Sequence, residues 1–204
     1  MGIVFCLLQY VVGARFAALM KYFAYLTDLR QVYKIFLSQL KTLAEEDLIK
    51  IIDRKLLEKT SEKAAAAPRR RMNHNFHELS DPVQRMLNAI EPGSYIRPHM
   101  HLDPDKMEMF IMLKGKGAVI TFDDDGQILE CFKLDASGET LGLEIPPGVW
   151  HTVVSSEVGT VFLEVKDGPY LPSTDKDFSS WSPLPDTPDA DRYLEGLLEK
   201  CNKL

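Results

Sequence analysis

The chain has 204 residues, of which 45% are hydrophobic and 26% are charged. These proportions are typical of a globular protein with a buried core, and they exclude general disorder. The formal net charge of -6 argues against nucleic-acid binding as the main role, because that role needs a positively charged surface.

The three cysteines are far apart in the sequence and form no CxxC pair. This spacing argues against a disulfide scaffold and against a zinc finger. We therefore expect a reducing compartment, in which each cysteine is a small buried apolar residue. The cysteines are Cys6, Cys131 and Cys201.

Residues 1–40 form an apolar segment that differs from the rest of the chain, and we expect a helical extension there. Residues 1–38 carry a net charge of +3, so the remainder carries -9. The longest charge-free run, 1–14, is shorter than the ~20 residues that span a bilayer. Three interpretations stay open: a helix packed on the domain, translation from a start codon too far upstream, or weak membrane contact through residues 1–26.

Apolar residues recur every three to five positions between Lys41 and Lys63, which predicts a helix. Acidic side chains lie in its first part and lysines in its last, as the helix dipole favours. The sequence AAAAPRRR at 64–71 reads as a linker with a solvated basic end, and the alternative is that one arginine binds an anionic ligand. We assign residues 41–72 to this N-terminal helix and linker.

After Asn73 the pattern changes to short apolar runs separated by turns that contain glycine or proline. Strands at this spacing predict an antiparallel sandwich or barrel. The runs with strand character are 107–113, 117–122, 127–134, 140–145, 149–155 and 160–166.

The tail at 169–188 is rich in proline, serine and aspartate, and we expect it to wrap the surface of the barrel. A tail across the barrel mouth would also close a pocket there. Asp189 to Asn202 has the apolar spacing of a short amphipathic helix. We accordingly assign residues 73–185 to the barrel with its wrap, and residues 186–204 to the C-terminal helix.

Two histidines form an HxH pair, His99 and His101. Residues i and i+2 of a strand point to the same face, so these imidazoles share a face and can chelate one metal ion. Glu108 shares its parity with Phe110 and Met112, which predicts a carboxylate that points inward and needs a partner.

His151 follows a Pro-Pro-Gly turn and shares its parity with Val149 and Val153. A lone histidine in that setting is usually a hydrogen-bonded core residue. Together with the HxH pair and Glu108, however, it supplies a fourth group of a type that binds metal ions. A shared site explains four such residues better than four separate accidents.

The spacing of these residues resembles the two cupin motifs. Six residues separate His101 from Glu108, where three or four are usual, and Thr140 and Ser155 stand where the second motif usually has glycine and asparagine. The first motif is matched by Gly93, His99, His101, Glu108 and Gly115, and the second by Pro146, Gly148 and His151.

A narrower resemblance covers roughly Lys41 to Pro185. Five blocks in order look like the WbuC family of cupin-fold metalloproteins, in the RmlC-like superfamily: RRRMNHNFH, DPVQRMLNAIEPGSYIRPHMH, EIPPGVWHTV, LEVKDGPY and DKDFSSW. The resemblance implies a mainly β fold, a double-stranded β-helix (jelly-roll) barrel with N-terminal helices and a short C-terminal helix. It also implies a homodimer, and a setting among genes for O-antigen and other surface polysaccharides.

The resemblance further implies one divalent metal ion, which would be Fe, Mn, Ni, Zn or Co, because imidazole with carboxylate does not choose among them. The implied ligands are His99, His101, Glu108 and His151. Strand parity adds four candidate substrate-binding residues, and for the last two a solvent-facing strand pair is the alternative. These four are Tyr95, Arg97, Glu164 and Lys166.

Two classes of function stay open. In one, the protein is a metal-dependent enzyme, isomerase-like or oxygenase-like, that acts on a sugar or sugar nucleotide in surface-polysaccharide biosynthesis. In the other, it is a non-catalytic cupin that binds a sugar or another ligand. The resemblance implies no catalytic mechanism, so no catalytic residue is assigned. A peptidase-type nucleophile finds no support, because no serine or cysteine lies in an activating motif. We expect a cytoplasmic location.

Overall fold

The computed structural model describes residues 31, 34, 49–173 and 175–203. The chain forms two compact units, Met1–Ile51 and Ile52–Leu204. The apolar extension predicted for 1–40, with its membrane contact, lies outside the described residues apart from positions 31 and 34. Within the described part, no helix is long and apolar enough to cross a membrane.

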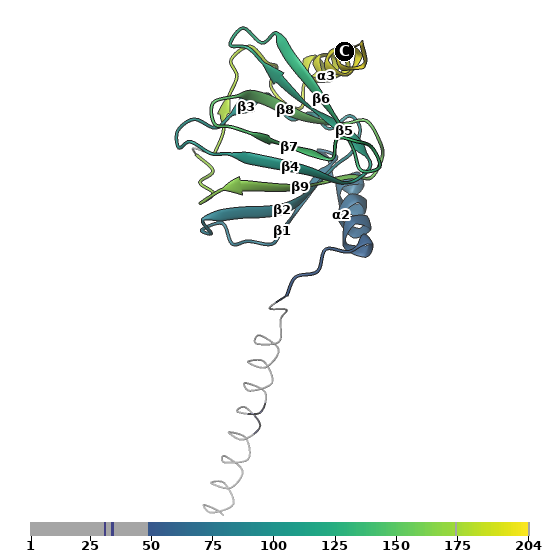
Figure 1. Cartoon of the computed structure of the whole chain (residues 1–204), viewed down its shortest axis with the longest axis vertical. Coiled ribbons are helices and arrows are strands. Elements are labelled where there is room, and N and C mark those ends of the chain that lie inside the picture. The colour runs from purple at the N-terminus through teal and green to yellow at the C-terminus, as the bar shows by residue number, and fades with distance from the viewer. Residues whose placement is uncertain (1–30, 32–33, 35–48, 174, 204) are drawn as a thin grey trace, which may run out of the picture. The chain divides into compact units, whose positions relative to one another are not determined.

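Two five-stranded sheets form the second unit (Figure 1). Neighbouring strands pair antiparallel, so the sequence correctly predicts a mainly β, double-stranded β-helix (jelly-roll) barrel. In spatial order, one sheet holds β1 (Arg71–Asn75), β2 (Val83–Ile90), β9 (Thr160–Asp167), β4 (Glu108–Lys114) and β7 (Gly142–Ile145). The other holds β10 (Asp177–Phe178), β3 (His99–Met100), β8 (Trp150–Ser155), β5 (Lys116–Phe122) and β6 (Ile128–Asp135).

A core of large apolar side chains lies between the sheets. Burial alternates along β4, so Phe110 and Met112 are buried on the same face as Glu108. This period of two is what predicts an inward carboxylate. The core cluster consists of Ile90, Phe110, Met112, Val119, Leu134, Ile145, Val153 and Phe162.

Two helices cover the barrel. Helix α2 (Arg54–Ala66) begins later than the predicted Lys41, and the described residues 49–53 before it are not helical. Asp53 caps α2, because its Oδ1 accepts a hydrogen bond of 2.8 Å from the backbone N–H of Leu56. The helix then continues into the alanines predicted as linker, which is consistent with the high helix propensity of alanine.

Helix α3 (Pro188–Lys203) agrees closely with the predicted C-terminal helix. Leu194 and Leu197 on α3 pack into a cluster with Ile120 and Phe122 on β5. Acidic residues in the first turn and lysines in the last suit the helix dipole. The barrel therefore has one apolar face covered by this helix.

Strands β1 and β2 were not predicted. β2 is buried along most of its length, because the barrel covers one face and α2 covers the other. Leu57 and Ala64 of α2 pack with Leu87 and Ala89 of β2. Burial on both faces removes the alternation on which the strand predictions depend.

Cys131 on β6 and Cys201 on α3 form a disulfide, with Cα atoms 5.6 Å apart. This Cα separation is normal for a disulfide. The prediction that every cysteine is an unpaired buried residue is therefore wrong for these two. Their separation of 70 residues hides the pairing, since only the docking of α3 brings them together.

We expect Cys201→Ser to lower the free energy of unfolding by about 2–4 kcal/mol, because the bond restricts the unfolded chain. Thermal unfolding with and without a reductant measures this. The wild type and a Cys6→Ser control should lose stability in the reductant, and Cys201→Ser should not respond. Equal stability of wild type and Cys201→Ser without reductant would contradict the prediction.

Candidate metal centre

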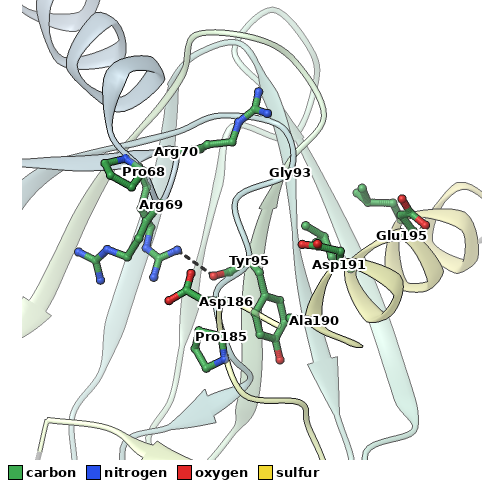
Figure 2. Close-up of a pocket in the computed structure, with 13 residues that line it drawn as sticks. Pro68, Arg69, Arg70, Gly93, Tyr95, Pro185, Asp186, Ala190, Asp191 and Glu195 are labelled. Carbon is green, nitrogen blue, oxygen red and sulfur yellow. Dashed lines mark hydrogen bonds between the residues drawn. The ribbon is translucent and has the colours of Figure 1, made fainter. Parts of the chain in front are cut away.

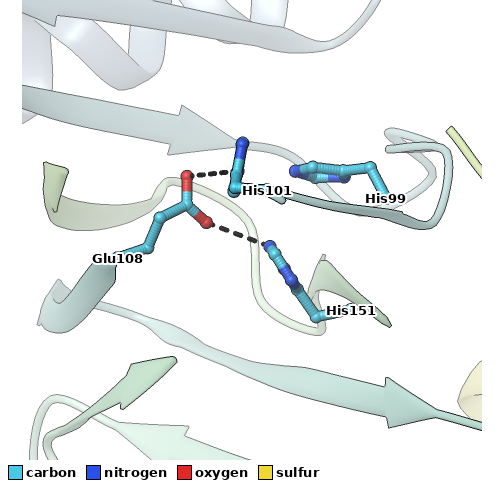
Figure 3. Close-up of side chains that lie close together, drawn as sticks. All are labelled: His99, His101, Glu108 and His151. Atoms are coloured by element: carbon cyan, nitrogen blue, oxygen red, sulfur yellow. Dashed lines mark hydrogen bonds and ion pairs between the residues drawn. The ribbon is translucent and has the colours of Figure 1, made fainter. Parts of the chain in front are cut away.

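The four predicted ligands meet inside the barrel (Figure 3). One ligand atom from each of His99, His101, Glu108 and His151 lies within 4.8 Å of the others. No side chain of the four is more than 3% exposed. The sequence correctly predicts that these residues lie together.

The two sheets bring the ligands together from opposite sides. His99 on β3 and His151 on β8 are direct partners across a strand pair, with ring centroids 4.5 Å apart. Glu108 opens β4 and lies opposite Lys166 of β9. Because β3 and β8 belong to one sheet and β4 and β9 to the other, the cluster lies between the sheets.

Each histidine has its Nδ1 atom against a backbone carbonyl oxygen. In His99 and His151 that oxygen belongs to the residue two positions earlier, at 3.0 and 2.9 Å, and His101 Nδ1 contacts the carbonyl of Asp175. A carbonyl only accepts, so Nδ1 carries the proton in each ring. In a neutral imidazole Nε2 is then an unprotonated electron-pair donor, the form that metal ions bind.

Glu108 places its carboxylate against two of these nitrogens. Oε1 lies 3.0 Å from His101 Nε2, and Oε2 lies 3.0 Å from His151 Nε2. The Nε2 atom of His101 is buried and has no hydrogen bond of normal geometry with any described group. A nitrogen lone pair and a carboxylate oxygen repel unless a proton or a cation lies between them. The donor set therefore fits one divalent cation shared by all four side chains.

Burial and neighbouring groups set the charges of the ligands. Burial lowers the pKa of His99 well below its usual value, and nearby Lys176 adds to this. Burial acts to raise the pKa of Glu108, but the contacts with His101 and His151 outweigh it and hold this pKa well below its usual value. His99 is thus neutral and Glu108 ionised at neutral pH, as metal ligands must be.

A buried ion-pair network borders the four ligands. Asp175, from the C-terminal tail, contacts Lys106 Nζ through Oδ1 and Lys166 Nζ through Oδ2, each at 2.9 Å. Lys166 Nζ also lies 3.4 Å from Glu108 Oε1. The backbone carbonyl of Asp175 accepts a hydrogen bond from His101 Nδ1, so this one residue orients a ligand and holds two buried ammonium groups.

Glu164 lies beside this network on β9. Its Oε2 accepts a hydrogen bond of 2.8 Å from Asn88 Nδ2, and its Oε1 is 4.0 Å from Lys166 Nζ. Burial and the nearby charge of Glu108 raise the pKa of Glu164. Both Glu164 and Lys166 are buried, so they are not a solvent-facing strand pair.

We expect Glu164→Gln to raise the free energy of unfolding at pH 8, because it removes a carboxylate whose ionised form is disfavoured by burial. A raised pKa means that the folded state binds the proton more tightly than the unfolded state does. The penalty is therefore present at high pH and disappears below the unfolded value of about 4.3. Urea unfolding at pH 8 and pH 4 measures the difference, with exposed Glu144→Gln as control. A gain that is the same at both pH values would contradict this assignment.

Tyr95 and Arg97 do not join the histidines, because residues 91–98 form no strand. Tyr95 lies near Asp186 and Ala190 (Figure 2), and its hydroxyl donates to the carbonyl of Pro183 at 3.0 Å. Arg97 Nη2 donates to the carbonyl of Ser179 at 2.6 Å. Arg97 thus holds the C-terminal tail, while Glu164 and Lys166 lie next to the ligands.

Three residues near the ligands were not predicted to belong to the site. They are Asp175, Lys106 and Asn88. The tail was predicted to wrap the barrel, and its strand β10 does pair with β3 beside His99. The position of Asp175 in the block DKDFSSW was the available signal, but local sequence does not show which lysines it meets.

The comparisons with known proteins concern part of the chain. A family model, described as a domain of unknown function (DUF6016), matches residues 52–134. No curated protein matches the chain.

Three solved structures resemble the barrel. The protein TT1209 from Thermus thermophilus is 19% identical with a TM-score of 0.44, over 58% of this chain and 97% of its own. The capsular polysaccharide assembling protein CapF from Staphylococcus aureus is 21% identical with a TM-score of 0.42, over 53% of this chain but only 31% of its own. A Klebsiella pneumoniae protein with a double-stranded beta-helix domain is 15% identical with a TM-score of 0.41, over 54% of this chain and 84% of its own.

Proposed function

We propose that this protein binds one divalent metal ion at the four buried ligands and is a metal-dependent enzyme acting on a small polar molecule. The observation that carries the proposal is the buried cluster of three imidazoles and one ionised carboxylate, whose ligand atoms lie within 4.8 Å of one another. Three imidazoles with one carboxylate are of the ligand types that bind metal ions in proteins. The ion is Fe, Mn, Ni, Zn or Co.

An enzyme is favoured over a purely structural metal site if the ion is six-coordinate. Structural sites tend to be closed, whereas four protein ligands would leave two positions open on such an ion. An ion bound at the four ligands would supply Lewis acidity towards a hydroxyl or carbonyl group of the substrate, or redox chemistry, according to the identity of the metal. The chain itself orients His101 through the carbonyl of Asp175 and places the Lys166 ammonium beside Glu108.

The substrate class follows from the WbuC resemblance and is a sugar or sugar nucleotide of surface-polysaccharide biosynthesis. The alternative is a non-catalytic cupin that binds such a molecule. Incubation of the metal-loaded protein with a panel of nucleotide sugars, followed by NMR, separates the two. Turnover that is lost after chelation and in His151→Ala supports the enzyme. Binding without turnover, unchanged by chelation, would contradict it.

The homodimer and the cytoplasmic location remain predictions. Light scattering of the full chain measures the first, and fractionation of cells measures the second. A monomer at micromolar concentration would contradict the predicted dimer.

A further inference from the structure

An open cavity of about 1190 Å³ adjoins the four ligands. Its wall is built from β1, β2 and β9 together with the C-terminal tail. Lys166 and Asp175 line it, and the same two residues contact Glu108 and His101. The cavity therefore borders the metal centre through one layer of side chains.

One part of the wall offers two acceptor atoms for which the described residues supply no hydrogen bond of normal length. The Glu164 carboxylate accepts, so the amide NH₂ of Asn88 must face it, and this leaves Asn88 Oδ1 directed away. Asn88 is only 9% exposed, and its Oδ1 has no hydrogen-bond partner among the described groups. Glu164 Oε1 lies 4.0 Å from Lys166 Nζ, beyond a normal hydrogen bond. Two acceptors on adjacent strands suit the hydroxyl groups of a polyol.

The cavity is also rich in basic side chains, in a chain that is acidic as a whole. Arg97 and Lys166 are engaged by the protein. Lys176 is half-buried and makes no ion pair with any described carboxylate. The basic lining residues are Arg69, Arg71, Arg97, Lys166 and Lys176, against the acidic Glu164, Asp175 and Asp186.

Lys176 and Glu164 both line the cavity. Burial lowers the pKa of Lys176, although the carboxylates of Glu108, Glu164 and Asp175 act to raise it. An anionic group placed there would stabilise the charged form. Exposed Arg69 lines the same cavity and can bind an anionic group as a bidentate donor.

We infer that this cavity binds a small hydroxylated anion, with hydroxyl groups on Asn88 and Glu164 and a carboxylate or phosphate on Lys176 and Arg69. This inference rests on the proposed function, because it names the substrate class of the same site. Carboxylate and phosphate share the chemistry that these cations recognise, so a sugar acid and a sugar phosphate are the two sources.

Calorimetric titration of the full chain, as purified with its metal and again after chelation, tests the inference. The probes are gluconate and glucose 6-phosphate, with glucose as the neutral polyol and with inorganic phosphate and acetate as anions without the polyol. We expect gluconate or glucose 6-phosphate to bind at least about tenfold tighter than glucose, phosphate or acetate. The tighter of the two identifies the anionic group.

Two variants assign the contacts. Lys176→Met should weaken binding of the hydroxylated anion about tenfold and leave glucose unchanged. Asn88→Leu should weaken gluconate and glucose alike and leave inorganic phosphate unchanged. Exposed Lys133→Met on β6, which does not line the cavity, should bind as the wild type does.

The inference is overturned if neither hydroxylated anion binds tighter than the simple probes, or if both variants bind as the wild type does. Metal content, measured on the same samples, separates this result from failure of the proposed function. Metal retained without selective binding contradicts the ligand class alone. Selective binding by protein that takes up no metal supports the ligand class and contradicts the metal-dependent enzyme.

Discussion

Replacing Asp175 by asparagine should lower the free energy of unfolding by about 3–5 kcal/mol, because it leaves buried ammonium groups without their carboxylate. The side chains of Lys106 and Lys166 are 2% and 4% exposed, so water cannot take its place. Lys106 would keep only the carbonyl of Pro169 at 2.8 Å among the contacts of the described residues. Lys166 would keep the longer contacts with Glu108 at 3.4 Å and Glu164 at 4.0 Å. Denaturant unfolding at pH 7 measures the loss.

Asp177→Asn is the matched control, two residues along the same tail. Asp177 Oδ2 accepts one long hydrogen bond of 3.3 Å from Leu102 N, so this change should cost about 1 kcal/mol or less. Equal effects of the two substitutions would contradict the central role of Asp175.

The pH dependence of Asp175 has a defined sign. Burial acts to raise its pKa, but the neighbouring lysines outweigh burial and lower it. Its contribution to stability is therefore complete above the unfolded value of about 3.9 and is lost as the pH falls through the lower folded value. The difference between wild type and Asp175→Asn should shrink in that acidic range.

Glu108→Gln should weaken metal binding by at least about 100-fold, because even groups that only orient ligands cost 10–100-fold when removed. The substitution removes the one carboxylate of the donor set and keeps the side-chain volume. Competition with a chelator of known affinity measures the change.

The metal-free form of the same variant gives an independent check. A glutamine NH₂ can donate to an unprotonated Nε2 of His101 or His151, where the carboxylate cannot. Metal-free Glu108→Gln should therefore remain folded, with Glu144→Gln as the exposed control. Unchanged metal affinity would remove Glu108 from the ligand set.

The strands from β4 to β9 could be predicted within about two residues, because each is a short run with strand character that ends at a turn. The alternating burial along β4 directs Glu108 inward. β2 could not be predicted in this way, since polar Gln84, Arg85 and Asn88 interrupt its apolar residues. The parity argument also fails for Tyr95, because it assumes a strand where the chain is irregular.

The metal ligands could be predicted because HxH spacing on a strand has one geometric consequence, and because two short motifs carry all four residues. The residues that surround them could not. Asn88 and Asp175 reach the site from β2 and from the tail, and the partners of Asp175 depend on how that tail crosses the barrel. The disulfide is hidden for the same reason, since docking of α3 brings Cys201 to Cys131.

The metal content of purified protein, measured by mass spectrometry for wild type, His99→Ala and His151→Ala, tests the central claim most directly. We expect close to one metal ion per chain in the wild type and loss of that ion in both variants. Its identity would then favour redox or Lewis-acid chemistry. A well-folded wild type that contains no metal and takes up none of Fe, Mn, Ni, Zn or Co would contradict the metal centre.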